Sequence, residues 1–128
     1  MDPTQEPVRH EIVGTDGQTI NTESLPWNPH PKFAGVALRH LVTGAGTGGR
    51  LSLHHVRVDP GCSIGDHAHA GQVEIHDVLA GTGSCTLEGA VISYAPGSMA
   101  IMPSDKVHRV DAGVQGLFLL ATFSPPLV

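Results

Sequence analysis

Apolar residues occur along this chain in short runs that do not follow a helical period. No segment keeps apolar residues at positions i, i+3, i+4 and i+7 over the length of a helix. Turns that contain some of the 16 glycines and 10 prolines separate the runs. Many short strands at close spacing are typical of an all-β sandwich or barrel. We therefore predict strands over residues 35–42, 51–58, 73–79, 84–87, 91–94, 99–102, 108–110 and 116–123.

Residues 1–31 differ from the rest of the chain because they are polar and rich in proline. We expect them to form an N-terminal arm, with one short strand over residues 10–13, that packs on the barrel or on a partner chain. Trp27 is the expected anchor, since an indole ring buries a large area. Residues 32–128 are expected to form one barrel domain, which suits a chain of this length. Whether the arm is exchanged between two chains is left open.

The composition limits the partners and the location of the protein. Charged residues make up only 15% of the chain, so part of the surface is expected to be covered, most simply in a homodimer. The formal net charge is -5 and the seven Lys and Arg residues are scattered, whereas nucleic-acid binding needs clustered positive charge. The apolar runs are too short to cross a membrane. The N-terminus lacks a secretory signal, so we expect a cytoplasmic protein in which Cys62 and Cys85 are reduced thiols.

Histidine is over-represented, with nine residues, and several lie between residues 52 and 77. His67 and His69 have the i, i+2 spacing that places two side chains on one face of a strand. Glu74 begins the next apolar run, so its carboxylate can reach the same point as the two imidazoles. His108 begins a later run after a turn containing Pro103, and a barrel can bring it to the same place.

Three imidazoles and one carboxylate suit a divalent transition metal, with Mn, Fe, Co, Ni, Cu and Zn all possible. Four protein ligands leave one or two coordination positions open, as catalysis requires. The sequence therefore predicts one metal ion per chain, held by His67, His69, Glu74 and His108. The alternative is a barrel that has lost its metal, but burying these groups without a partner is costly.

Both stretches resemble the two signature motifs of the cupin superfamily. The first motif is matched at every fixed position: Gly61, His67, His69, Glu74 and Gly81. The second is matched at Gly97, Pro103 and His108, and departs at Asp105 and Ala112, where the family has Gly and Asn. Asp tolerates a left-handed turn better than most residues, so the first departure need not change the turn. The resemblance covers about residues 35–123 and implies a jelly-roll β-barrel with the metal inside, as in RmlC-like proteins, and often a homodimer.

Other residues near the motifs are weighed between a chemical and a structural role. His76 follows Glu74 by two residues and should face the interior, as a general acid or base, a partner of the metal ligands or a hydrogen-bonded core residue. One of His54 and His55 must face inward, but the register decides which, and at least one is expected on the surface. Tyr94 could touch a ligand, although a surface position is the simpler expectation.

Three functions are compatible with this sequence. The first is a metal-dependent enzyme that acts on a small polar metabolite, a sugar acid or other carboxylate, by isomerase- or lyase-type Lewis-acid chemistry. The segment around Trp27 resembles the arm of small cupins that act on sugar acids. The second is a cupin dioxygenase that uses Fe or Cu. The third is a non-catalytic module that binds a small molecule or a metal. A fold does not by itself choose among them.

Overall fold

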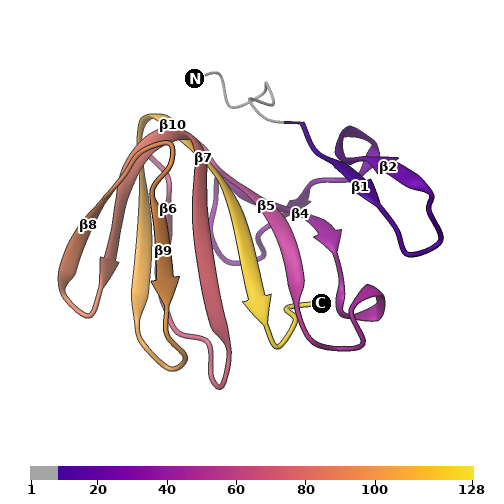
Figure 1. The fold of residues 1–128 in the computed structure, drawn as a ribbon. Coiled ribbons are helices and arrows are strands. Elements are labelled where there is room, and N and C mark those ends of the chain that lie inside the picture. Colours follow the sequence, from indigo (N-terminus) through magenta and orange to yellow (C-terminus); the bar gives the residue numbers. More distant parts are fainter. Residues whose placement is uncertain (1–8) are drawn as a thin grey trace.

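The computed structural model describes residues 9–128, and within them the chain is almost entirely β-structure (Figure 1). Eight strands form one sheet in the order β3-β4-β5-β10-β7-β8, with β6 paired to β10 and β9 paired to β7. This sheet curls into a jelly-roll barrel, as predicted. The elements are β1 (Glu11–Val13), β2 (Thr19–Asn21), η1 (Thr22–Ser24), β3 (Asn28–Pro29), β4 (Val36–Val42), η2 (Gly44–Gly46), β5 (Ser52–Val58), β6 (Ser63–His67), β7 (Val73–Leu87), β8 (Ala90–Tyr94), β9 (Met99–Met102) and β10 (His108–Ser124).

Two long strands replace four of the predicted short ones. β7 spans the predicted strands 73–79 and 84–87, and β10 spans 108–110 and 116–123. The glycines between them bend the strands without ending them: Gly81 and Gly116 have positive φ, and the β7–β10 register shifts between Ala112 and Leu117. A Cβ atom on Gly81 would lie 2.0 Å from the Gly116 carbonyl oxygen, so the two backbones touch at this bend.

The core lies inside the barrel and follows the alternation of the strands. On β7, Glu74, His76 and Val78 are buried, as predicted, because their side chains share the inner face. Apolar residues fill most of the interior, and burying each large one contributes about 1.5–3 kcal/mol to stability. The buried apolar cluster contains Val36, Val56, Val58, Ile64, Val78, Cys85, Tyr94, Ala100, Met102, Val110, Leu117, Leu119, Ala121 and Phe123.

The predicted arm is partly attached to the barrel and partly projects from it. Trp27 packs on the outer face of the sheet, with its ring edge against Phe118 and the guanidinium groups of Arg39 and Arg57 at 4.3 and 4.6 Å from the ring centroid. The prediction that Trp27 anchors the arm is thus confirmed. β3 also pairs with β4, so the arm joins the sheet before residue 32. The division into 1–31 and 32–128 stays a prediction.

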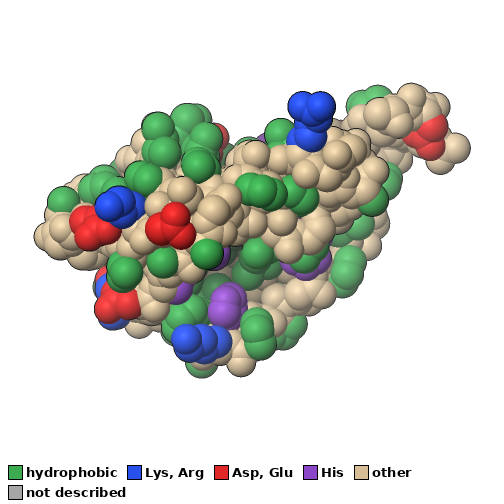
Figure 2. Space-filling model, turned by 90° about the horizontal axis from the view of Figure 1, so that it is seen from below, with side chains coloured by type: hydrophobic (Ala, Val, Ile, Leu, Met, Phe, Trp, Pro, Cys, Tyr) green, Lys and Arg blue, Asp and Glu red, His purple; other side chains and the backbone are tan. Residues whose placement is uncertain are grey.

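The β1–β2 hairpin stands away from the barrel (Figures 1 and 2). Its strands pair only with each other among the described residues, and most of their residues are exposed.

Cys62 and Cys85 are free cysteines, as expected. Among the described residues there is no helix of the length and hydrophobicity that a membrane span requires.

Candidate metal centre

The four predicted ligands come from three parts of the chain and meet inside the barrel. His67 ends β6, Glu74 lies near the start of β7, and His108 begins β10, where it pairs with His67. One ligand atom from each of these residues and from His69 lies within 4.8 Å of the others. The structure therefore brings the predicted set together, while the presence of a metal stays a prediction.

His69 reaches the centre by a different route from the one expected. It lies beyond the end of β6, so it does not share a strand face with His67. A turn over residues 68–72 directs it inward, and Asp105 holds this turn: the Asp105 N–H donates to the His69 carbonyl at 3.0 Å, and the Gly71 N–H donates to Asp105 Oδ1 at 3.3 Å. Asp105 has a φ of 66°, so it adopts the left-handed conformation that the family's glycine would adopt, as anticipated.

Hydrogen bonds to the backbone orient two of the imidazoles. His67 Nδ1 lies 2.7 Å from the Gly65 carbonyl oxygen, and His108 Nδ1 lies 3.1 Å from that of Lys106. A carbonyl oxygen accepts only, so each Nδ1 carries a hydrogen, and in the neutral ring each Nε2 keeps its lone pair. An outer hydrogen bond of this kind is what metal-binding histidines ordinarily have.

Three polar atoms at the centre are buried without a hydrogen-bond partner: His69 Nε2, Glu74 Oε1 and His108 Nε2. The two nitrogens lie 3.3 and 3.2 Å from Glu74 Oε1, close enough for charge contact but not aligned for hydrogen bonds. Leaving such atoms unsatisfied costs about 1–3 kcal/mol each. A cation among them would satisfy all three, so the residues present fit a divalent metal.

The electrostatics favour the ligating form of Glu74 and His67. Burial would raise the pKa of Glu74, but His76, together with His108 and His69, outweighs it and holds this pKa well below the usual value. Burial lowers the pKa of His67, and the neighbouring His108 and His69 lower it further. Burial also disfavours charge on His108, yet its contact with Glu74 raises its pKa overall. At neutral pH Glu74 is therefore ionised.

His76 supports Glu74 and has no free ring nitrogen. Its Nε2 lies 2.9 Å from Glu74 Oε2, and its Nδ1 lies 2.8 Å from the Tyr94 hydroxyl. Burial raises the pKa of Tyr94, so the hydroxyl stays protonated. The simplest arrangement has Tyr94 donating to Nδ1 and Nε2–H donating to the carboxylate. The expectation that Tyr94 lies on the surface is wrong: β8 turns its side chain inward and leaves it 1% exposed.

His54 and His55 are both buried, so the expectation of one surface histidine is also wrong. His54 faces inward near Phe123, and burial lowers its pKa to about 4, with His40 adding to this and Glu74 opposing it. His55 faces outward but is covered by the arm, where its ring contacts His10 and Trp27. The arm closes over a face that the strand pattern alone would leave open to water.

A small cavity of about 90 Å³ adjoins the candidate centre, and histidine side chains are visible in the hollow face of Figure 2. Apart from three of the predicted ligands, its walls are mostly apolar. A second cavity, of about 280 Å³, lies next to it. We call the 90 Å³ cavity the inner cavity and the 280 Å³ cavity the outer cavity. Both are lined by His30, Leu38 and Leu127. The inner cavity is lined by His67, His69, Glu74, His30, Leu38, Val56, Ile64, Phe123 and Leu127.

Sequence reasoning did not find His30, His40 and Leu127 as pocket residues. His30 and His40 lie outside both motifs, yet both line the outer cavity. Leu127 follows the last strand, and only its hydrogen-bonded return over the barrel places it there. No local signal in the sequence identifies these positions.

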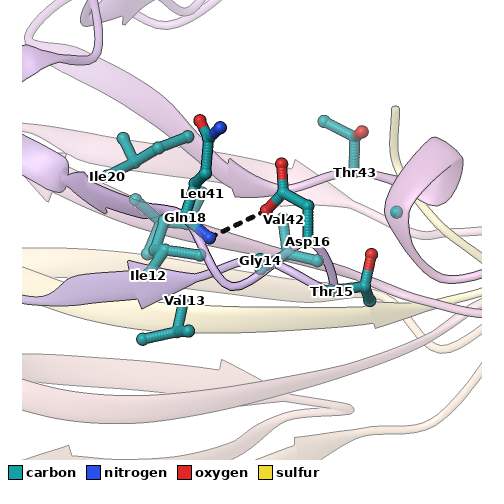
Figure 3. Close-up of a pocket in the computed structure, with 11 residues that line it drawn as sticks. Ile12, Val13, Gly14, Thr15, Asp16, Gln18, Ile20, Leu41, Val42 and Thr43 are labelled. Carbon is teal, nitrogen blue, oxygen red and sulfur yellow. Dashed lines mark hydrogen bonds between the residues drawn. The ribbon is translucent and has the colours of Figure 1, made fainter.

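A larger opening, of about 460 Å³, lies between the β1–β2 hairpin and the end of β4 (Figure 3). Its one charged side chain is Asp16, whose carboxylate accepts the Gln18 N–H at 2.9 Å. Among the described residues that line this opening there is no second ionisable group and no histidine. The convergent polar atoms lie at the smaller cavity, which is therefore the candidate site.

The fold and the site together define a class: single jelly-roll barrels with three histidines and a glutamate converging in the interior. The chain belongs to the cupin superfamily, since a family model described as "Cupin domain" matches residues 54–116, about half of its length, and similar solved structures have this fold. No curated protein is matched by the sequence.

Three solved structures illustrate the similarity. A predicted oxalate decarboxylase from Thermotoga maritima has a TM-score of 0.77 and 21% identity, covering 84% of this chain and 98% of that one. KdgF from Halomonas sp. has a TM-score of 0.70 and 21% identity, covering 80% and 88%. Ectoine synthase from P. lautus has a TM-score of 0.66 and 21% identity, covering 73% and 67%. At these identities the likeness shows the fold, and not the reaction.

Proposed function

We propose that this protein is a metal-dependent enzyme that acts on a small carboxylate, such as a sugar acid, by isomerase- or lyase-type chemistry. The observation that carries the proposal is the convergence of His67, His69, Glu74 and His108 beside a small cavity, where three of their buried polar atoms have no hydrogen-bond partner. Neighbours whose names denote enzymes, the decarboxylase-like protein and ectoine synthase among them, agree with it.

His67, His69, Glu74 and His108 would hold the metal. When bound, a divalent metal supplies Lewis-acid polarisation of a substrate oxygen. Glu74 brings the negative charge that offsets the cation, and His76 fixes the rotation of its carboxylate from the far side. Because both His76 nitrogens are engaged, we assign His76 first to positioning Glu74. A direct catalytic role for His76, as a proton donor or acceptor, stays a prediction.

The apolar wall of the inner cavity excludes water from the side of the site opposite the ligands. Leu38, Val56 and Phe123 line it together with the predicted ligands. Exclusion of water strengthens the interactions of charged groups inside the cavity. A bound divalent metal would offset the charge of the ionised Glu74 and attract a carboxylate that enters the cavity.

The test is elemental analysis of protein purified without a histidine tag or chelator. We expect about one equivalent of a divalent metal, and little metal in the His67→Ala, His69→Ala double variant. The His10→Ala variant is the matched control, because His10 contacts His55 on the outer face of the sheet and should retain full metal content. Unchanged metal in the double variant would refute the site.

The identity of the metal separates the alternatives. Stoichiometric Mn, Ni, Co or Zn would favour isomerase or lyase chemistry. Stoichiometric Fe or Cu, followed by substrate-dependent O2 uptake, would favour the dioxygenase. Absence of metal even after incubation with divalent ions would leave a non-catalytic binding module.

We further propose that the protein is a homodimer and that the β1–β2 hairpin contacts the second copy. A lone two-stranded hairpin is marginally stable in water, and this one exposes 66% of Val13 and 47% of Ile20. Light scattering should show a dimer, and removal of residues 1–21 should weaken it. A full-length monomer at micromolar concentration would contradict this. A cytoplasmic location stays a prediction.

A further inference from the structure

The segment after β10 runs back across the barrel and contributes a wall to the candidate site. Three hydrogen bonds hold its backbone: the Leu127 N–H donates to Ser52 Oγ, the Gly44 N–H donates to the Val128 carbonyl, and Gln72 Nε2 donates to the Pro125 carbonyl, each at 2.8 Å. The path of this segment is therefore set by backbone groups and by side chains of the barrel. The side chain of Leu127 takes no part in these bonds.

Leu127 lies where the inner and outer cavities meet. Within residues 9–128, three residues line both cavities: one from the arm (His30), one from β4 (Leu38) and Leu127 itself. The inner cavity, at about 90 Å³, is about a third of the size of the outer one, at about 280 Å³. The inner cavity therefore suits a small head group. A longer ligand whose head group reaches the centre would extend past these three side chains into the outer cavity.

The outer cavity offers mostly apolar surface with a few polar edges. Pro29 and Pro31 line it together with Leu38 and Leu127. His30 Nδ1 accepts the backbone N–H groups of Lys32 and Phe33 at 3.0 and 3.2 Å, so the hydrogen of the neutral ring is on Nε2. Burial, with a contribution from Lys32, lowers the pKa of His30 and keeps the ring neutral at pH 7. His30 thus offers one hydrogen-bond donor beside apolar walls.

We propose that Leu127 determines specificity by limiting the length of the carboxylate that reaches the metal centre, and that the outer cavity binds the body of short-chain carboxylates. This inference rests on the proposed function, because it assigns the inner cavity to the metal-bound head group. The ligand class it selects has an oxygen-bearing head and a short, largely apolar body with at most a few polar groups. Among the carboxylates of the proposed function, the outer cavity therefore favours acids with few hydroxyl groups over polyhydroxylated sugar acids.

The test uses protein loaded with Co²⁺ and a series of formate, acetate, butyrate and hexanoate. Binding is followed by the visible spectrum of the metal and by calorimetry, so the measurement does not depend on activity. We expect formate and acetate to bind at least tenfold more tightly than hexanoate. In Leu127→Ala the two cavities merge, and the affinity for hexanoate should rise at least tenfold while that for formate changes little.

Two further variants keep the test decisive. Val128→Ala removes a neighbouring apolar side chain but keeps the backbone bond to Gly44, and its length profile should match that of the unmodified protein. Leu127→Phe enlarges the wall and should shift the cut-off towards shorter ligands. Leu127 is 38% exposed, so both changes at this position should leave the fold intact, which a melting curve checks.

The outcomes separate the two proposals. If Co²⁺ binds with one-to-one stoichiometry and all variants share one length profile, Leu127 does not set specificity and the inference is overturned, while the metal site stands. If Co²⁺ does not bind, the proposed function fails, and the inference fails with it.

Discussion

His54 should make the stability of this protein depend on pH between pH 7 and pH 5. Its pKa is lowered to about 4 in the folded chain, whereas an imidazole in the unfolded chain titrates near 6.5. Between pH 7 and pH 5, His54 becomes protonated in the unfolded state but stays mostly neutral in the folded state, so the free energy of unfolding decreases as the pH falls. With these two pKa values, acidification from pH 7 to pH 5 should cost about 2 kcal/mol through His54 alone.

The assay is urea unfolding of metal-free protein at pH 7 and pH 5, for the unmodified chain and for His54→Gln. The variant will differ at both pH values because packing changes, so the quantity compared is the change between them. We expect that change to be smaller in the variant by about 2 kcal/mol. His40→Gln removes a lesser cause of the shift and leaves the burial of His54, so it should reduce the change by less. Equal pH dependence in all three proteins would refute the reasoning.

Three other expectations concern the glycine bend, the support of Glu74 and the metal. Gly81→Ala should prevent folding, because the φ of Gly81 is positive and the added Cβ would lie 2.0 Å from the Gly116 carbonyl oxygen. In Gly97→Ala the added Cβ meets no atom within 4 Å, so the free energy of unfolding should fall by only about 1–2 kcal/mol. Thermal melts followed by circular dichroism would compare the two variants. Similar melting temperatures for the two would rule out the close contact. Tyr94→Phe removes the hydrogen-bond partner of His76 Nδ1, so it should lower the free energy of unfolding by about 1–3 kcal/mol and weaken metal binding. Chelator competition measures the metal affinity. An unchanged affinity would mean that this hydrogen bond does not influence the metal ligands. Removal of metal by chelator should lower the melting temperature, since metal at 100 times its Kd adds about 2.7 kcal/mol, and an unshifted melting curve would contradict a bound metal.

Much of the barrel could be predicted from the sequence because its information is local. Alternation on β7 and the motif spacing together indicated that Glu74, His76 and Val78 share an inner face, and that His108 begins a strand. Two glycine-containing segments, 80–83 and 111–113, are predicted as turns from the sequence, whereas they lie within the bent strands β7 and β10. Local sequence does not distinguish the two, because in both cases glycine supplies a positive φ.

The remainder depends on contacts between distant parts of the chain. The burial of His55 requires the arm to lie over β5, and the place of Leu127 requires the last residues to return to Ser52. Neither His30 nor His40 carries a spacing that marks it as a pocket residue. The convergence of the four ligands was found because the family motif already encodes their separation in space.

Trp27 is the one tryptophan of the chain, and it lies where the arm meets the barrel, with two guanidinium groups against its ring. Indole fluorescence depends on the surroundings of the ring. The emission of this protein therefore reports on one place, and release of the arm would expose the ring to water and shift the emission to longer wavelength while the barrel stayed folded. Circular dichroism follows the unfolding of the strands. Comparing the fluorescence transition with the circular dichroism transition would therefore show, without any label, whether the arm detaches before the sheet unfolds.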